Sequence, residues 1–165
     1  MLFERFYPSE WRSSAYSVNY EAMYEKGYRH IIFDIDNTLV PHGAPQDERS
    51  LKLLRRIKEI GFDVLFLSNN KEPRVKSFAD PVGAYYLYKA GKPSKKGYLE
   101  AVKRMKGTIV DTFFVGDQLF TDIWGANNAG LYSILVNQID KKEEIQIVLK
   151  RILERPVLFF YKLKK

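Results

Sequence analysis

The sequence has 165 residues, 45% of them hydrophobic, which fits one folded domain with a proper core and argues against disorder. It has no cysteine and only two histidines, which excludes disulfides, thiolate-bound zinc and a histidine-rich metal site, so any metal would have oxygen ligands, as Mg²⁺ prefers. Lysine and arginine outnumber aspartate and glutamate by 27 − 20 = 7, which suits an anionic partner such as phosphate, nucleic acid or an acidic membrane surface.

The two ends of the chain differ from its middle. Residues 1–27 predict an aromatic and basic N-terminal arm, followed by a short helix over residues 19–26 that ends at Gly27. The arm lacks the features of a signal peptide, and no apolar run approaches the roughly 20 residues of a membrane span, so a cytoplasmic protein is expected. Residues 156–165 form a tail that mixes aromatic and basic side chains.

Between these ends, apolar runs typical of strands alternate with amphipathic segments typical of helices. The predicted strands are residues 31–35, 62–67, 83–88, 108–115 and 131–136. The predicted helices are residues 47–60, 72–79, 94–105, 119–128 and 143–154, the last with Ile145, Val148, Leu149 and Ile152 facing inward. This alternation predicts a single Rossmann-like α/β domain with three layers and a parallel sheet of about five strands.

The first of these strands ends in two carboxylates, Asp34 and Asp36. A parallel strand that is buried on both faces should be apolar throughout, and Asp34 breaks that pattern where the strand leaves the sheet. Burying one ion costs several kcal/mol unless it is paired or bound to a metal. The pair therefore suggests a metal and an anion, although aspartates that simply cap the next turn would give the same pattern.

Polar side chains follow four of the predicted strands. They are Asp34, Asp36 and Thr38; Ser68 and Asn69; Lys92; and Asp117 with Asp122. Right-handed crossovers place the carboxyl ends of parallel strands at one edge, and open α/β sheets bind ligands beyond that edge. One such cluster would mean little, but four of them predict a single site.

The residue types of this site suit phosphoryl transfer. A carboxylate can attack phosphorus and form an aspartyl phosphate, and a second acid two residues later can reach the leaving group. Thr38 and Ser68 offer hydroxyl groups to phosphoryl oxygens, and Lys92 offers a positive charge. Asp117 would complete a metal site made of oxygen ligands. Together these groups would stabilise the charge of the transition state.

The four segments resemble, in order and spacing, the four motifs of the haloacid dehalogenase (HAD) phosphohydrolase superfamily. Residues 34–38 resemble the first motif, Ser68 the second, Lys92 the third and residues 116–122 the fourth. The first and fourth motifs are specific as a pair, whereas the lone serine and lysine would be weak signals without them. The resemblance implies one HAD-like phosphatase domain over residues 1–165.

Within this superfamily, the details are similar to those of the subfamily IIIA phosphatases. The opening arm, the run FDIDNTLVP and the run GDQLFTDIWGAN resemble a bacterial branch related to the phosphatidylglycerophosphate phosphatases of mitochondria. The resemblance implies a Mg²⁺-dependent phosphomonoesterase. Asp34 would be the nucleophile and a metal ligand, and Asp36 would be the acid/base and would ligate through its main-chain carbonyl. Asp117 would also bind the metal, with Asp122 behind it as a helper.

The resemblance also assigns the groups that hold the phosphoryl group. Ser68 and Lys92 would bind it, and Asn69 would contact it through its backbone N–H. Thr38 would donate a hydrogen bond from its hydroxyl group to a phosphoryl oxygen and would position the acid pair.

The substrate class is inferred from what the chain lacks and from its tail. The intervals 39–67 and 69–91, where members of the superfamily often carry a cap domain, are filled by helices and strands that the core needs. An uncapped site admits large or anchored substrates, or else needs a partner surface to close it. The aromatic and basic tail suits an anionic membrane interface, or else packs on the domain. A phospholipid monophosphate such as phosphatidylglycerophosphate is therefore the preferred substrate, with peripheral contact at the inner membrane face.

Other functions are compatible with parts of the pattern. A catalytically silent phosphate-binding or regulatory domain could keep the scaffold, but it would not need Asp36 beside Asp34. A nucleic-acid end phosphatase would suit the charge of +7, but no basic-aromatic recognition stripe is present, so no nucleic-acid partner is expected. A phosphomutase usually needs a cap that excludes water. The sequence leaves the oligomeric state open.

Overall fold

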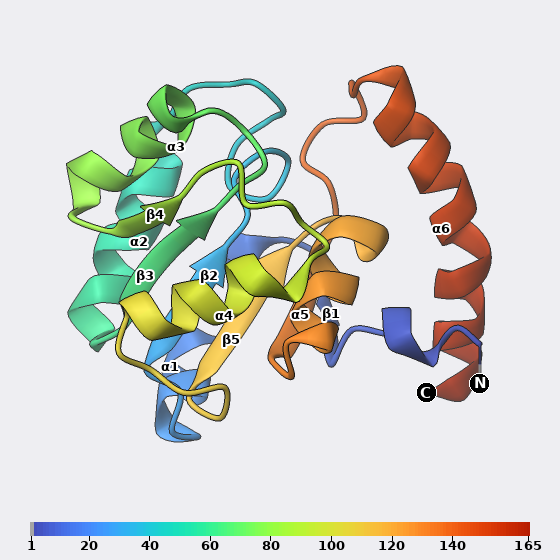
Figure 1. The fold of residues 1–165 in the computed structure, drawn as a ribbon, viewed down its shortest axis with the longest axis horizontal. Helices are drawn as coiled ribbons and strands as arrows, with labels where there is room; N and C mark the ends of the chain where they lie inside the picture. Colours follow the sequence, from blue (N-terminus) through green and yellow to red (C-terminus); the bar gives the residue numbers. More distant parts are fainter. Residues whose placement is uncertain (1) are drawn as a thin grey trace.

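The computed structural model describes residues 2–165, so Met1, the first residue of the predicted arm, lies outside the described residues. Within residues 2–165 six parallel strands form one sheet in the order β1-β6-β5-β2-β3-β4 (Figure 1). The strands are β1 (Glu10–Arg12), β2 (His30–Phe33), β3 (Asp63–Leu67), β4 (Tyr85–Leu87), β5 (Thr112–Gly116) and β6 (Tyr132–Val136).

Helices connect these strands, as the alternating pattern predicts. The α-helices are α1 (Tyr20–Glu25), α2 (Glu48–Ile60), α3 (Glu72–Ala79), α4 (Lys95–Arg104), α5 (Trp124–Asn128) and α6 (Ile145–Lys164). Shorter helical turns are η1 (Glu4–Phe6), η2 (Ala15–Ser17), η3 (Asp80–Val82) and a π-helical turn, η4 (Leu119–Ile123), that leads directly into α5. The predicted α/β architecture is confirmed, but the sheet formed by residues 2–165 has six strands where about five were predicted.

The sixth strand comes from the N-terminal arm. β1 pairs in parallel with β6, with Trp11 opposite Leu135. It has only three residues, too few for a strand pattern to be recognised, so its pairing is set by tertiary contacts that the sequence pattern does not reveal.

The strand predicted over residues 108–115 is shorter than expected and begins at Thr112. Its first residues form a turn instead, because two side chains bond to the backbone of the same segment. The Thr108 N–H donates to Asp111 Oδ1 at 2.8 Å, and the Asp111 N–H donates to Thr108 Oγ1 at 3.3 Å. Such local bonds compete with the ladder of a sheet.

Helices cover both faces of the sheet, giving the three layers. Successive side chains of a strand point to opposite faces. Ile31 and Phe33 of β2 pack with α1, α2 and α3, whereas Ile32 packs with α4 and α5. The connection between the first two polar clusters holds only α2 and β3, and the next one holds α3, η3 and β4. The edge of the sheet where the strands end is therefore left open.

Helix α6 lies at one end of the sheet, beside the N-terminal arm (Figure 1). It continues through Pro156 to Lys164, so the prediction of a helix that ends at residue 154 and a separate tail is wrong. A proline removes one backbone hydrogen bond, but packing compensates for it here. Beyond Pro156, Tyr161 is buried and its ring lies 5.4 Å from that of Tyr7 and 6.2 Å from that of Trp11.

The predicted inward face of α6 is also wrong. Ile145, Leu149 and Ile152 are 70%, 57% and 50% exposed, and Val148 is half-buried. The buried side chains of this helix are instead Glu154, Val157 and Tyr161. None of the helices within residues 2–165 is long and apolar enough to cross a membrane.

Candidate active site

The four polar clusters meet at the carboxyl edge of the sheet. They surround a pocket of about 270 Å³, which is lined by Asp34, Asp36, His42, Ser68, Asn69, Asn70, Lys92, Gln118, Thr121 and Ile147. Asp34 follows the central strand β2, Ser68 follows β3, and Asp117 follows β5. The structure therefore brings the predicted site residues together. Three of them do not line the pocket but lie behind the residues that do: Thr38, Asp117 and Asp122.

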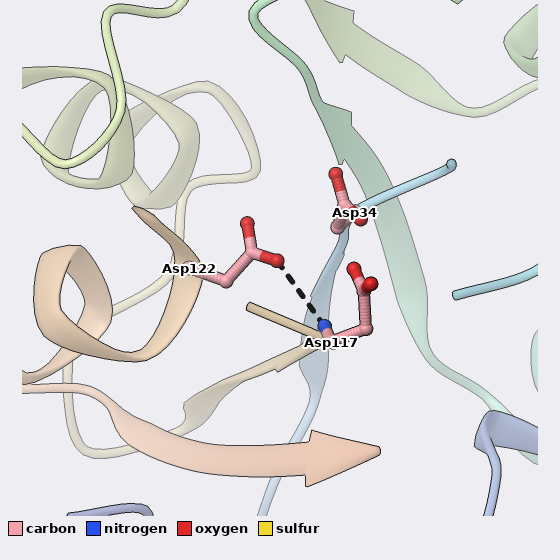
Figure 2. A group of neighbouring side chains, drawn as sticks. All are labelled: Asp34, Asp117 and Asp122. Carbon is pink, nitrogen blue, oxygen red and sulfur yellow. Dashed lines mark hydrogen bonds between the residues drawn. The ribbon is translucent and has the colours of Figure 1, made fainter. Parts of the chain in front are cut away.

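Three carboxylates converge at the floor of this site. Asp34, Asp117 and Asp122 each place an oxygen within 4.8 Å of the others, and all three residues are buried (Figure 2). Three hard oxygen donors at this spacing fit a divalent cation of the Mg²⁺ type. Asp36, which the resemblance made a ligand through its main-chain carbonyl, is not part of this carboxylate group.

Lys92 and Thr38 tie the three carboxylates together. Lys92 Nζ donates to Asp34 Oδ1 at 2.8 Å and to Asp122 Oδ1 at 2.7 Å, and its side chain is only 4% exposed. Thr38 Oγ1 lies 2.9 Å from Asp34 Oδ2 and 3.2 Å from Asp117 Oδ1, so its proton can serve either carboxylate. Both residues thus fix the orientation of the acids, and of the two only Lys92 lines the pocket.

The acids strongly influence one another's protonation. Burial, and then the charge of Asp122, raises the pKa of Asp34 above its ordinary value despite the opposing charge of Lys92. Burial, followed by the charges of Asp34 and Asp122, raises the pKa of Asp117 well above its ordinary value. Burial works to lower the pKa of Lys92, but Asp122 and Asp34 outweigh it and raise the pKa. A cation placed among these carboxylates would favour their ionised forms.

Asp122 shapes the loop that presents Asp117. Its Oδ2 accepts hydrogen bonds from the N–H groups of Asp117 and Gln118, both at 3.1 Å. Its Oδ1 already accepts from Lys92, which suits the predicted helper better than a direct metal ligand. Gly116 is required for this packing, because a Cβ there would lie 2.7 Å from Asp122 Oδ2.

Asp36 points away from the three acids, to the rim of the pocket. Its Oδ1 accepts from the Gly43 N–H and from Arg74 Nη2, both at 2.7 Å. Burial works to raise the pKa of Asp36, but the hydrogen bonds from Arg74 and Gly43 and the charges of Arg74 and His42 outweigh it, so the pKa is lowered. Sequence reasoning missed Arg74, because nothing in α3 marks one arginine among other basic residues.

We expect Arg74→Gln to destabilise the fold by about 1.5–3 kcal/mol at pH 7, because it removes a charge-assisted hydrogen bond to a largely buried carboxylate. A carboxylate whose pKa is lowered by folding stabilises the fold above its unfolded pKa, and this contribution is lost as the pH falls through the folded value. The difference in the free energy of unfolding between Arg74→Gln and wild type should therefore be constant from pH 7 to about pH 5 and become smaller below about pH 4.

Urea unfolding across this pH range measures the effect. Arg104→Gln is the matched control, because Arg104 pairs with Glu100 on the surface of α4, and it should change stability by less than about 0.5 kcal/mol. A gap for Arg74→Gln that stays constant below pH 4 would contradict the role assigned to Asp36.

Ser68 and Asn69 organise the rim beside Lys92. Ser68 is buried and its Oγ accepts from the Asn70 N–H at 3.1 Å. Asn69 clamps the backbone of Lys92 from both sides: Oδ1 accepts from the Lys92 N–H at 2.8 Å, and Nδ2 donates to the Lys92 carbonyl at 3.2 Å. The side chain of Asn69 therefore positions the lysine, a contact that sequence reasoning did not foresee.

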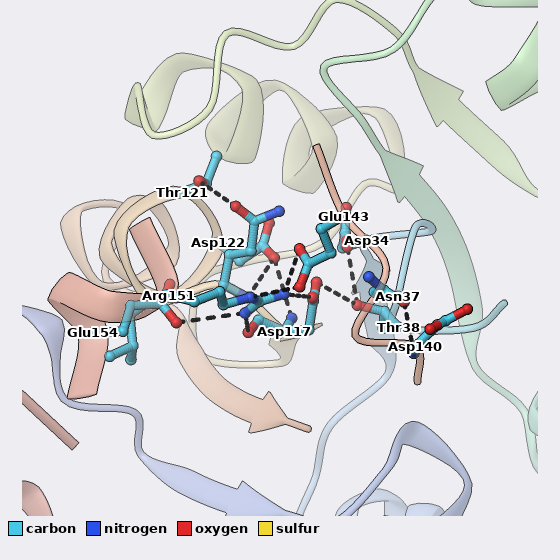
Figure 3. A network of polar contacts seen from close by, with 12 residues as sticks. Asp34, Asn37, Thr38, Asp117, Thr121, Asp122, Asp140, Glu143, Arg151 and Glu154 are labelled. Atoms are coloured by element: carbon cyan, nitrogen blue, oxygen red, sulfur yellow. Dashed lines mark hydrogen bonds and ion pairs between the residues drawn. The ribbon is translucent and has the colours of Figure 1, made fainter. Parts of the chain in front are cut away.

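The inner face of α6 reaches the acid cluster through Arg151 (Figure 3). Its Nη2 contacts Asp117 Oδ2, and its Nη1 donates to the Asp117 carbonyl at 2.6 Å. Its Nε donates to Glu143 Oε1 at 3.0 Å, and its Nη1 lies 3.5 Å from Glu154 Oε2. Glu154 Oε1 in turn accepts from the Leu119 N–H at 2.9 Å. Sequence reasoning missed this contact. The only sequence feature that could have indicated it is the spacing of Arg151 and Glu154, three residues apart in a helix that is otherwise mainly apolar and basic.

Asn37 provides a second link between the site and the segment that leads into α6 (Figure 3). Its Oδ1 accepts from the Asp140 N–H at 3.0 Å, and its carbonyl accepts from the Ile139 N–H at 3.3 Å. Asn37 has a φ of 59°, in the left-handed region that asparagine tolerates better than most residues. The loop that follows Asp34 is thus held from the C-terminal part of the chain.

Comparisons with known proteins identify the family of this chain. The model of a family described as haloacid dehalogenase-like hydrolase matches residues 45–130. The chain is 36% identical over 165 residues to the probable phosphatase YqeG of Bacillus subtilis, a match that covers 99% of this chain and 96% of that protein. It is 28% identical over 143 residues to phosphatidylglycerophosphate phosphatase 1 (chloroplastic/mitochondrial) of Arabidopsis thaliana, covering 79% of this chain but only 40% of that protein.

Solved structures share the fold. An uncharacterized protein from Corynebacterium glutamicum aligns with a TM-score of 0.56 at 20% identity, over 77% of this chain and 93% of that one. The 3-deoxy-D-manno-octulosonate 8-phosphate phosphatase of Moraxella catarrhalis, in complex with a magnesium ion, a phosphate ion and a KDO molecule, aligns with a TM-score of 0.55 at 14% identity, over 73% of this chain and 76% of that one. At these identities the likeness establishes the fold alone.

Proposed function

Because the chain belongs to the haloacid dehalogenase-like hydrolase family and is a phosphatase, we propose that it is Mg²⁺-dependent, works through an aspartyl phosphate on Asp34 and acts on a phospholipid monophosphate. The observation that supports this chemistry is the placement of Asp34 at the end of the central strand. It lies between Lys92 and Thr38 on the floor of an open pocket, with Asp36 at the rim.

The reaction would proceed in two displacements. A carboxylate oxygen of Asp34 forms a bond to phosphorus as the bond to the leaving alkoxide breaks. The protonated form of Asp36, which is the minor form in the free enzyme because its pKa is lowered, gives that alkoxide a proton. Asp36 then takes a proton from a water molecule, whose oxygen attacks the phosphorus, and the bond to Asp34 breaks to release phosphate. Lys92 would meet the negative charge that builds on the phosphoryl oxygens, and Ser68 would donate to one of them.

The three converging carboxylates fit the proposed metal. Asp34 and Asp117 would hold it, with the main-chain carbonyl of Asp36 as a further oxygen ligand. When bound, the cation would supply positive charge to the transferring phosphoryl group. The magnesium ion described for the Moraxella catarrhalis phosphatase supports this choice of metal.

Two observations support a lipid substrate. The pocket is open at the carboxyl edge, because the two connections where a cap could be inserted hold only α2, α3, η3 and core strands, so a headgroup on a bilayer could reach Asp34. The Arabidopsis thaliana relative is named for phosphatidylglycerophosphate, which supports the same headgroup for this chain. We infer phosphatidylglycerophosphate as the substrate within this class.

Hydrolysis assays test the metal and the substrate separately. With p-nitrophenyl phosphate, we expect activity in Mg²⁺ and its loss in EDTA. With phosphate esters, we expect kcat/KM for phosphatidylglycerophosphate to exceed that for glycerol 3-phosphate and nucleoside monophosphates by at least about tenfold. Full activity in EDTA would overturn the metal proposal, and a preference for a water-soluble ester would overturn the lipid proposal.

A further inference from the structure

One side of α6 is apolar along its whole length and faces solvent. This outer face is formed by Ile145, Leu149, Ile152, Leu153, Pro156, Phe159, Phe160 and Leu163. At about 100° per residue these positions fall within a sector of about 120°. Half of the large hydrophobic side chains that are exposed within residues 2–165 lie on this one face. Such a concentration is typical of a binding surface.

Cationic side chains border the outer face on both sides. Helical spacing places Lys150 and Lys164 along one edge, and Arg155 and Lys162 along the other, and all four are exposed, although Lys164 pairs with Glu4 of the N-terminal arm. The acidic side chain of α6, Glu154, is buried on the opposite side of the helix, next to Arg151. The exposed charges of this helix are therefore all positive.

We propose that the outer face of α6 docks on the surface of an anionic lipid bilayer. An apolar face with basic edges is the pattern of a helix that lies in the interface, where the side chains enter the acyl boundary and the cations meet lipid phosphates. A second copy of the chain fits less well, because two such faces packed together would bring like charges into contact. Charge complementarity thus favours the bilayer.

A neighbouring groove extends this surface. At the C-terminal end of α6, an apolar groove of about 500 Å³ is lined by Leu2, Phe3, Tyr7, Phe160, Leu163 and Lys164, and so continues the outer face into the N-terminal arm. The catalytic pocket lies on the other side of α6, where Ile147 lines it, so docking would leave the pocket uncovered. The docking itself requires no phosphate ester and is independent of the proposed substrate.

Vesicle co-sedimentation of the full chain tests the proposal. We expect binding to phosphatidylcholine vesicles that contain about 30% phosphatidylglycerol, and at least tenfold weaker binding to pure phosphatidylcholine. About 0.5 M NaCl should weaken the binding to anionic vesicles, because salt screens the contribution of the cations. Ile152→Asp should weaken it at least tenfold, since it places a charge in the middle of the outer face.

Val110→Asp is the matched control, because Val110 is 82% exposed but lies in the loop before β5. It should bind vesicles as wild type does, and both variants should keep the wild-type melting temperature because both positions are exposed. The proposal would be overturned if the wild-type protein did not bind anionic vesicles, or if Ile152→Asp bound them as well as wild type does. A dimer detected by light scattering that Ile152→Asp converts to a monomer, without any vesicle binding, would assign the face to self-association instead.

Discussion

Replacement of Asp34 by asparagine is expected to reduce phosphatase activity by at least about 10³-fold, because an amide cannot form the covalent bond to phosphorus that the carboxylate forms. The same variant should lose the acid-stable phosphoprotein that quenched wild-type enzyme would show. Activity on p-nitrophenyl phosphate and acid-quench trapping with labelled substrate measure the two effects.

The stability of this variant separates a catalytic loss from unfolding. Burial and Asp122 raise the pKa of Asp34, so the fold disfavours its ionised form, and this cost to stability grows as the pH rises from the unfolded pKa and levels off above the folded pKa. In EDTA, Asp34→Asn should therefore be at least as stable as wild type to urea. Asp63→Asn, at the exposed start of β3, is the control and should keep full activity. Substantial activity in Asp34→Asn would exclude Asp34 as the nucleophile.

The site could be predicted from the sequence because each of its residues follows a strand, and the direction of the strands is known. Each polar cluster follows an apolar run, and parallel strands send their ends to one edge. The order of strands and helices was therefore enough to predict that four of the site residues meet: Asp34, Ser68, Lys92 and Asp117. The contacts that orient them could not be predicted in this way. Asn69 reaches across to Lys92 because of loop geometry, which no periodic pattern encodes.

Helix α6 shows a different limit of sequence patterns. The apolar positions Ile145, Leu149 and Ile152 do share one face of a helix, as predicted, but that face is exposed. Periodicity identifies which residues share a side and does not say which side is covered. The covered side is polar in part because it meets Asp117, through Arg151. A helix with an ionic inner face and an apolar outer face is unusual for a domain in water, and it is the basis of the docking proposal above.

Replacement of Arg151 by methionine is expected to destabilise the fold by about 3–5 kcal/mol, which would lower Tm by roughly 6–20 °C for a chain of this size. The side chains of Asp117, Glu143 and Glu154 are 0%, 2% and 5% exposed, and Arg151 contacts all three. Methionine fills a similar volume but leaves these carboxylates without their cation. Lysine should rescue only part of the loss, because it cannot bond the carbonyl and the carboxylate of Asp117 as a fork.

Thermal unfolding in EDTA and in Mg²⁺ measures this effect and tests the metal site at the same time. Mg²⁺ should narrow the gap between Arg151→Met and wild type, because a cation held by Asp117 replaces part of the charge that the variant lacks. Arg155→Met is the matched control: Arg155 lies one turn further along α6 and is exposed, so its replacement should change stability by less than about 0.5 kcal/mol. If the two substitutions lowered Tm equally, the contact between Arg151 and the acid cluster would not be what stabilises the position of α6. A large effect confined to Arg151 would mean that the helix proposed to meet the bilayer and the carboxylate proposed to hold the metal share one ionic contact.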